Sequence, residues 1–327
     1  MARFVFRRLL TLIPTLLVIS IISFIVIQLP PGDWLSTYVM QLAQSGTLVD
    51  QAELLALERR YAMGQPMHIQ YFRWISRVVR GDFGMSFEYG QPVRELIQER
   101  LLLTVFISFC SLIFSWVVAF PIGIYSAVKQ HSMGDYAATF VGFLGLSTPN
   151  FMIALVLMYV AMQHFGLSVG GLFSPEYVRA PWSAARFFDM LKNLWLPVII
   201  VGTSGTATLI RVLRNNLLDE LQKQYVVTAR AKGVHAVRLT LKYPVRMALI
   251  PFVSVAGWQL PELVSGEMIT AVVLSLPTTG PLLLSALLAQ DMYLAGGFIL
   301  LLAVLMVIGT LLSDILLALV DPRIRYE

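Results

Sequence analysis

The sequence predicts an all-α membrane protein with six transmembrane helices. Hydrophobic residues make up 57% of its 327 residues and charged residues only 13%. A soluble protein of this length would carry about 25% charged residues. Several uncharged runs reach about 20 residues or more, which is the length that an α-helix needs to cross a bilayer. The composition therefore argues strongly against a free soluble enzyme.

The first three predicted spans are long and uncharged. Leu9–Leu29 follows three arginines, and residues 30–33 (Pro-Pro-Gly-Asp) come after it in place of a small-residue cleavage site. We therefore interpret it as an uncleaved first span and not as a signal peptide. Leu101–Val128 and Tyr136–Phe165 are the second and third predicted spans.

The last three predicted spans are less regular. Leu194–Ile210 is shorter and ends at a basic residue. The fifth span runs from Met247 to about Leu276 and is interrupted by two glutamates. Tyr293–Ser313 is the sixth. Because no internal repeat or flexible linker is visible, we treat residues 1–327 as a single transmembrane domain.

Two hydrophilic segments separate the spans. Residues 30–100 are too long and too charged for a simple turn, and we expect a small extracytoplasmic helical patch there. Residues 211–246 hold eight basic and only two acidic residues. The positive-inside rule places this loop and both termini in the cytoplasm. The formal net charge of +5 is thus explained by topology, and no nucleic-acid partner is expected.

A search for catalytic motifs finds one that needs weighing. Residues 202–205 (Gly-Thr-Ser-Gly) match the serine motif of rhomboid-type intramembrane proteases. A nucleophilic Ser204 would need a base within hydrogen-bond reach, and no histidine follows His235. We interpret the motif as small residues that allow close helix packing. There is also no phosphate-binding loop and no metal-ligand spacing.

The basic loop has a helical pattern of its own. Arg211–Leu221 can continue the fourth span, Tyr225–Lys232 can form a second short helix, and Gly233 is a natural helix end. Small side chains would let the second helix sit in a partner's groove, with basic side chains at the rim. The alternative is a solvated loop that only fixes topology, but the helix–Gly–helix pattern favours a docking element. Its candidate residues are Tyr225, Thr228, Ala229, Arg230, Ala231, Lys232 and Gly233.

This segment, ending Tyr-Val-Val-Thr-Ala-Arg-Ala-Lys-Gly at residues 225–233, resembles the EAA loop of binding-protein-dependent ABC importer permeases. The closest group is the oligopeptide, dipeptide and nickel (DppB/OppB-like) permeases. Further motifs match in the same order along nearly the whole chain. They are Arg7-Arg8-Leu9-Leu10, Pro31-Gly32-Asp33, Arg80-Gly81-Asp82-Phe83-Gly84 with Ser86, residues 146–151 (Leu-Ser-Thr-Pro-Asn-Phe), Leu196-Pro197 and residues 321–326 (Asp-Pro-Arg-Ile-Arg-Tyr).

The resemblance implies the type I ABC importer transmembrane fold in a prokaryotic cytoplasmic (inner) membrane. It implies that the loop forms a coupling helix inserted into an ATPase subunit, with Thr228, Ala229 and Gly233 at the core of the motif. Val227 stands where the wider family usually has glutamate. The implied partners are a second homologous permease, two cytoplasmic ATPases, an extracytoplasmic substrate-binding protein and the lipid bilayer. ATP and Mg²⁺ would bind the ATPases, and no cofactor is expected in this chain.

The fifth span holds the candidates for the translocation path. Ionisable residues at membrane depth are costly and by default functional, so Glu262 and Glu267 are expected to face the path or the permease interface. They could instead lie near the outer surface or bond within the bundle. Trp258 could stack on a sugar ring or fill the core. The span also departs from relatives, with residues 277–280 reading Pro-Thr-Thr-Gly and Ala271 standing where a glutamate is common.

The function expected from the resemblance is ATP-driven import of peptides or a similar small polar solute by alternating access. Oligosaccharides, opines, glutathione or nickel are alternative cargoes within the same family. An ion-coupled secondary transporter is the alternative from another class, with Glu262 and Glu267 as candidate proton sites.

Overall fold

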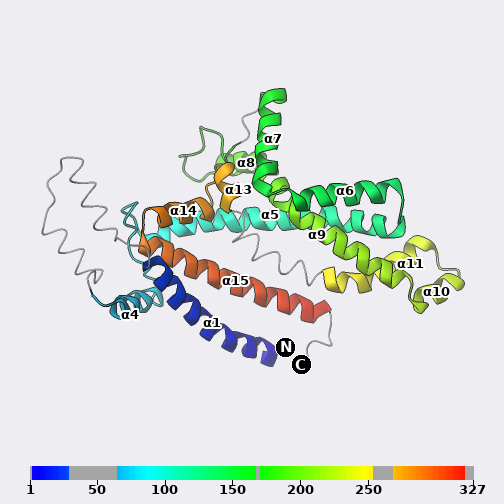
Figure 1. Ribbon diagram of the computed structural model, residues 1–327, viewed down its shortest axis with the longest axis horizontal. Helices are drawn as coiled ribbons and strands as arrows, with labels where there is room; N and C mark the ends of the chain where they lie inside the picture. Colours follow the sequence, from blue (N-terminus) through cyan, green and yellow to red (C-terminus); the bar gives the residue numbers. More distant parts are fainter. Residues whose placement is uncertain (1, 29–64, 167–169, 253–267, 321–327) are drawn as a thin grey trace. The chain divides into compact units, whose positions relative to one another are not determined.

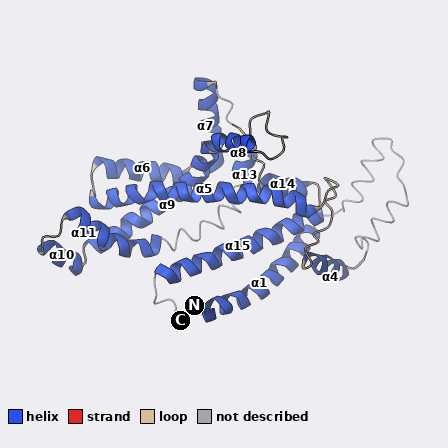
Figure 2. Cartoon of the chain, turned by 180° about the vertical axis from the view of Figure 1, so that it is seen from behind, coloured by secondary structure: helices blue, strands red, loops and turns tan. Residues whose placement is uncertain are grey.

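The computed structural model describes residues 2–28, 65–166, 170–252 and 268–320, and the regular structure in these ranges is helical (Figures 1 and 2). Three of the described helices, within Val93–Val128, Trp195–Leu221 and Met292–Leu312, are long and apolar enough to cross a membrane. A bent pair of helices makes a fourth if it is counted as one span. This agrees with a multi-span helical protein, whereas six spans and the orientation of the termini stay predictions.

The chain divides into two compact units. One comprises residues 1–5, 103–277 and 306–327, and the other comprises residues 6–102 and 278–305. The contacts below are described within each unit. The prediction of a single permease domain is not tested by this division.

In the second unit, an aromatic cluster holds α1 (Ala2–Gln28) against α4 (Met67–Val78). The ring of Phe24 lies 5.5 Å from that of Tyr71 and 5.6 Å from that of Trp74. The hydroxyls of Ser20 and Tyr71 are 2.8 Å apart and share a hydrogen bond. The described part of the 30–100 segment thus contains a helix, as expected, and that helix packs on the first predicted span.

The loop after α4 is tied to the start of α15 (Met292–Val320) by a buried carboxylate. Ser86 donates a hydrogen bond of 2.5 Å from Oγ to Asp291, and the backbone amide of Glu88 donates to the same oxygen at 3.2 Å. The second oxygen of Asp291 accepts from the amide of Leu294, which caps the helix. Burial raises the pKa of the Asp291 carboxyl.

Gly84 explains part of the sequence pattern in this loop. It adopts φ +84°, and a Cβ there would lie 2.8 Å from the ring of Tyr293. Tyr89 adds a hydrogen bond from its hydroxyl to Ser285 of α14 (Thr279–Leu288) at 2.9 Å. The Arg-Gly-Asp-Phe-Gly segment at residues 80–84 therefore leads into a tight turn that seats the last helix.

In the first unit, α9 (Trp195–Leu221) packs closely on α5 (Val93–Val128) and α6 (Met133–Ser147) (Figure 1). A Cβ built at Gly202 would lie 2.6 Å from the Phe114 ring, and the Ser115 hydroxyl donates to the carbonyl of Gly202 at 2.9 Å. The packing interpretation of residues 202–205 is thus confirmed at Gly202. A Cβ at Gly145 would likewise lie 3.0 Å from Thr203.

The predicted third span is not one straight helix. α6 ends at Ser147 and α7 (Asn150–Phe165) begins after two intervening residues, with a bend of 106° between the two helices. Thr148 is extended, at φ −102° and ψ 124°, because the ring of Pro149 disfavours the helical conformation in the residue before it. The prediction of an uninterrupted helix over Tyr136–Phe165 was therefore wrong at this proline.

The segment between α7 and α9 is held by a buried arginine. Arg186, in the first turn of α8 (Ala184–Asn193), is only 7% exposed and lies 4.6 Å from the ring centres of both Phe173 and Trp182. Its guanidinium also donates to the carbonyl of Ala180. Elsewhere in this unit, residues 244–252 are helical and α13 (Met268–Val273) contacts α7.

Candidate functional site

The candidate site begins where α9 continues beyond its apolar half. The predicted helical extension over Arg211–Leu221 is confirmed, because α9 is unbroken from Trp195 to Leu221. Leu213 and Leu217 in this extension are completely buried. Lys223 is extended, at φ −69° and ψ 147°, and α10 (Gln224–Ala231) starts after it in a new direction (Figure 1). The short helix is thus attached to a firmly packed support.

The end of α10 is a Schellman motif centred on Gly233. This residue adopts φ +75°, its amide donates to the carbonyl of Arg230 at 3.0 Å, and the amide of Val234 donates to the carbonyl of Ala229 at 3.3 Å. These are the two backbone bonds that define the motif. A Cβ at Gly233 would meet no atom within 4 Å, so only the positive φ requires glycine there.

One face of α10 is anchored. Val226 is completely buried, and Leu239 of the following helix α11 (Ala236–Lys242) is 2% exposed. The Tyr225 hydroxyl donates to the carboxylate of Glu220 at the end of α9. Burial and this carboxylate raise the pKa of Tyr225, so the phenol stays protonated and able to donate at neutral pH.

The opposite face of α10 is exposed. Val227 is 51% exposed, and Thr228, Ala231 and Gly233 are exposed as well, while Ala229 is half-buried. The Thr228 hydroxyl donates to the carbonyl of Gln224 at 2.9 Å, so its hydrogen is used within the helix. The methyl group is therefore the main feature that Thr228 adds to this face. Small side chains around one apolar residue suit insertion into a groove.

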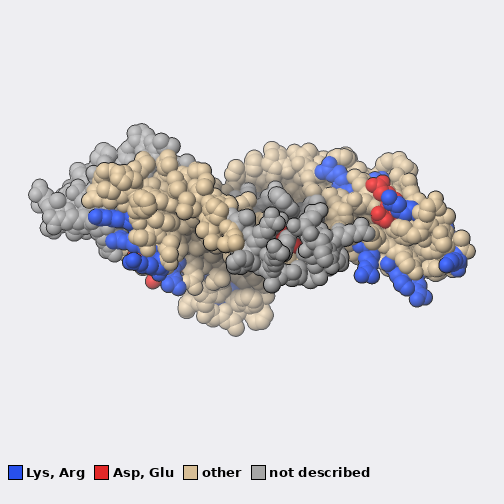
Figure 3. Space-filling view, turned by 90° about the horizontal axis from the view of Figure 1, so that it is seen from below, with Lys and Arg blue, Asp and Glu red and all other residues tan. Residues whose placement is uncertain are grey.

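Exposed basic side chains lie on α10, at its C-terminal end and on α11. Figure 3 shows Lys and Arg gathered at the end of the molecule that carries α10 and α11. The exposed basic residues of these two helices and their boundary are Arg230, Lys232, Arg238 and Lys242. All seven predicted docking residues lie on this short helix and its C-terminal turn, and Arg230 and Lys232 are exposed. Their role in docking stays a prediction.

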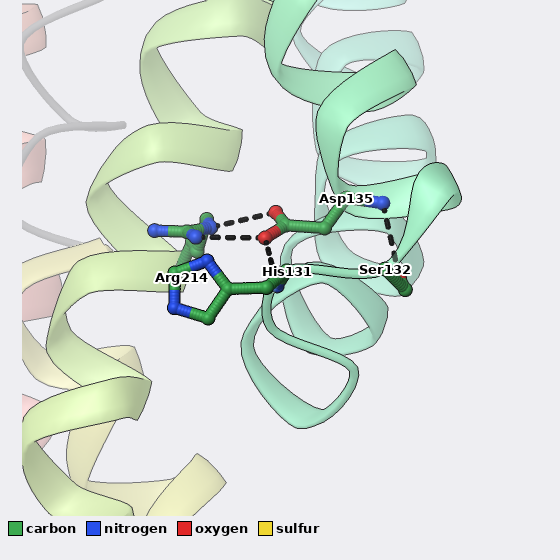
Figure 4. Close-up of polar contacts among 4 residues, drawn as sticks. All are labelled: His131, Ser132, Asp135 and Arg214. Carbon is green, nitrogen blue, oxygen red and sulfur yellow. Dashed lines mark hydrogen bonds and ion pairs between the residues drawn. The ribbon is translucent and has the colours of Figure 1, made fainter.

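An ion pair next to this element was not predicted. Arg214 of α9 donates from Nε and Nη2 to the two carboxylate oxygens of Asp135 in α6, both at 2.8 Å (Figure 4). Asp135 is 2% exposed and Arg214 is 22% exposed. Parallel bidentate bonds of this kind fix orientation as well as distance. The pair thus fastens the beginning of α6 to the part of α9 that leads to α10.

The turn before α6 holds the Asp135 carboxylate in position. Ser132 caps the helix, accepting from the amide of Asp135 at 3.2 Å, and the amide of His131 donates to Asp135 at 3.0 Å (Figure 4). His131 adopts a positive φ of 64°, which aims its amide inward. The sequence did hold a signal, because Ser-x-x-Asp at residues 132–135 is a capping-box pattern. The arginine 79 residues away could not be inferred from it.

The proposed path residues cannot be placed. Trp258, Glu262 and Glu267 lie outside the described residues, so their role in the translocation path stays a prediction. The described chain resumes one residue later in α13, where Ala271 is 6% exposed and packs in a core cluster with Leu274 and Ile200. This position is therefore filled by a buried small side chain.

These features define a class: a membrane protein whose described part is helical, and in which a long packed helix leads into a short helix with one buried and one exposed face. Two family models match the chain. Residues 119–326 match the "binding-protein-dependent transport system inner membrane component" and residues 1–108 match the N-terminal component of the same system. The chain belongs to this family of inner-membrane permease subunits.

Individual relatives agree along the full length. The chain is 35% identical to the oligopeptide transport system permease protein AppB of Bacillus subtilis over 328 residues, with 100% of both chains covered. It is 31% identical to the dipeptide permease DppB of Escherichia coli K12 over 344 residues and 30% identical to the glutathione permease GsiC of Salmonella paratyphi A over 327 residues, again with 100% of each chain covered. The protein is thus a permease subunit of a binding-protein-dependent importer, a transporter component and not an enzyme.

Proposed function

We propose that this permease imports peptides or a similar small polar solute, delivered by a substrate-binding protein and driven by ATP hydrolysis on separate subunits. The names of its relatives support peptide as the cargo, since two of them are oligopeptide and dipeptide permeases. The proposed complex contains a second homologous permease and two cytoplasmic ATPases. In this arrangement the chain crosses the membrane six times, with both termini and α10 in the cytoplasm.

The proposed role of α10 is to transmit the motion of the ATPases. Its exposed face, with Val227 and Thr228 at the centre, enters a groove of an ATPase, while buried Val226 and the Tyr225–Glu220 bond hold its other face to α9. Movement of the groove then moves α9. Transport by alternating access needs a helical bundle with two arrangements whose balance ATP binding shifts. ATP and Mg²⁺ bind the ATPases in this proposal, and no cofactor is needed in this chain.

One observation carries the proposal: eight residues of α10 combine an anchored face and an exposed small-residue face, and a Schellman turn fixes the end of the helix. A loop that served only to fix topology would need positive charge but no such division into faces. A helix that transmits motion needs both faces: the exposed face binds the ATPase, and the anchored face is held to the rest of the permease.

The first test is a mild-detergent affinity purification from native membranes, with every co-purifying chain identified. We expect two ATPase chains and a second permease in the complex. Isolation of the protein alone, under conditions that preserve other ABC complexes, would overturn the proposal. Uptake by the lone protein in proteoliposomes under an ion gradient would then establish an ion-coupled secondary transporter.

The cargo is tested separately from the mechanism. The binding protein that accompanies the complex is purified, and its bound ligand is identified by mass spectrometry. Short peptides are expected. A ligand of another kind, such as glutathione, an oligosaccharide, an opine or nickel, would change the cargo and leave the ATP-driven mechanism intact. The glutathione permease among the relatives makes glutathione the first alternative to compare in uptake assays.

A further inference from the structure

A cleft lies between α6 and α9, and no residue of α10 lines it. Its volume is about 300 Å³, at the lower end of the range for small-molecule pockets. Phe143 and Leu146 of α6 and Ile210 of α9 supply most of its apolar wall. The small residues Gly142 and Ala207 lie where the two helices approach each other, and a Cβ at Gly142 would sit 3.9 Å from Ala207. Small side chains thus leave room between larger apolar ones.

One end of the cleft is cationic. Arg211, Arg214 and His131 line it together with Asp135. Asp135 is already engaged by Arg214 through both carboxylate oxygens (Figure 4). Arg211 is exposed and lies 6.0 Å from the centre of the Phe143 ring, and no acidic side chain in the described ranges forms an ion pair with it. Among the described side chains, the positive charge of Arg211 therefore has no acidic partner, and it lies beside the aromatic ring of Phe143.

The cleft has a defined depth in the bilayer. Arg211 is the first charged residue after the apolar run at 194–210, so it marks the end of the hydrocarbon-spanning part of α9. Ala207 and Ile210 belong to the apolar run that precedes Arg211, and the ring of Phe143 lies beside the Arg211 guanidinium. Around the cleft, Phe140 and Val141 of α6 are each 65% exposed, which is typical of a face turned toward lipid. The apolar wall thus lies at acyl-chain depth and the cationic rim at headgroup depth.

We infer that this cleft binds one anionic phospholipid, with its phosphate on Arg211 and part of an acyl chain against Phe143, Leu146 and Ile210. A guanidinium matches phosphate geometry and can bind it through two parallel hydrogen bonds. A free phosphate would leave the apolar wall uncovered, and a zwitterionic lipid brings its own cation beside Arg211. Basic pockets at the end of membrane helices favour headgroups with net negative charge. The inference holds for either orientation of the chain and does not depend on the cargo.

The test uses the whole transporter complex, extracted and washed in mild detergent, followed by mass spectrometry of the retained phospholipids. We expect the complex to retain phosphatidylglycerol in preference to phosphatidylethanolamine. Arg211→Gln is expected to lower retention by about fivefold or more, the factor for removing one basic residue near a membrane surface. Lys129→Gln is the matched control, because this substitution also removes one positive charge. Lys129 is exposed in the turn after α5 and does not line the cleft. Equal retention in all three proteins would overturn the inference.

A second measurement does not depend on the folding of the arginine variant. A photo-crosslinking amino acid is placed at Phe143 in the otherwise unchanged complex, and the cross-linked product is identified by its mass. A phospholipid adduct is expected. A cross-link to the second permease in place of lipid would show that protein covers the cleft and would refute lipid binding. Exchange of phosphatidylglycerol nanodiscs for phosphatidylcholine nanodiscs should reduce the lipid adduct if the negative headgroup is what Arg211 selects.

Discussion

Arg214 donates a hydrogen bond of 2.8 Å to each carboxylate oxygen of Asp135, and this pair joins the first turn of α6 to the C-terminal part of α9. The two residues are 79 positions apart in the chain. Since Ser132 and the amide of His131 also hold the Asp135 segment, the ion pair connects two ordered backbone segments and not two flexible side chains. We therefore expect the start of α6 to follow any movement of α9.

Removing one partner of this pair should destabilise the protein more than removing both. Asp135→Ala leaves an uncompensated arginine and is expected to cost about 3 kcal/mol, with partial relief because Arg214 is 22% exposed. The double variant Asp135→Leu/Arg214→Met fills the space with apolar groups and should recover most of that loss. Thermal unfolding of the purified complex measures both. A double variant as unstable as the sum of the two single variants would contradict a coupled pair.

Gly233→Val should leave the protein in the membrane but uncouple ATP hydrolysis from uptake. A non-glycine residue at positive φ costs about 1–2 kcal/mol, so α10 loses its fixed end. Gly233→Asn should keep most of the uptake, because asparagine tolerates this conformation.

Gly166→Val is the matched control for that experiment. Gly166 ends α7 at φ +61° with no atom within 4 Å of a Cβ, so the strain is similar but far from α10 in the sequence. Uptake and ATPase activity of the reconstituted complex should stay coupled in this variant. Normal uptake by Gly233→Val, or equal uncoupling by Gly166→Val, would remove the assignment of coupling to the end of α10.

The buried carboxyl of Asp291 predicts a pH effect on stability. Its pKa is raised by burial, so its contribution to stability is fully present below the unfolded pKa of about 4 and declines as the pH rises through the higher folded pKa. Asp291→Asn cannot titrate. The difference in unfolding temperature, wild type minus Asp291→Asn, should therefore fall as the pH rises above about 4. A difference that is constant, or that grows with pH, would show that the carboxyl is not the titrating group.

The residues at 202–205 allow a direct comparison of packing with catalysis. Gly202→Ala places a methyl group 2.6 Å from the Phe114 ring and should destabilise the protein by about 1–3 kcal/mol. Gly142→Ala, with only an ordinary contact at 3.9 Å, should be neutral or stabilising. Ser204→Ala should leave uptake unchanged. Loss of a proteolytic activity in Ser204→Ala would instead support the protease interpretation.

Periodic and local features were predictable from the sequence. The extension of α9 to Leu221, a short helix over Tyr225–Lys232 and its end at Gly233 follow from composition, helix length and glycine chemistry. The structure agrees, with the short helix observed over Gln224–Ala231. The bend at Pro149 was signalled by the proline itself but was outweighed by the long apolar run around it. Proline inside an apolar run can kink or end a helix, and hydropathy alone does not decide which.

Contacts between distant residues were not predictable. In the sequence, Arg214 is one of eight basic residues in its loop, and no motif marks Asp291, which seats the last helix through Ser86. Such pairs depend on how helices pack, which a single sequence does not state. Arg186 is a similar case, since its burial between Phe173 and Trp182 is set by loop geometry and not by any motif.

The unbroken length of α9 has a mechanical consequence. A 27-residue helix is about 40 Å long, so a tilt of about 5° displaces one end by about 3.5 Å relative to the other. Two of its close contacts lie in its first third, at Gly202 against Phe114 and Thr203 against Gly145. If the helix tilts about these contacts, a displacement of one end moves the other end in the opposite direction. Glycine at the fulcrum keeps the neighbouring helices close enough to define the axis of rotation.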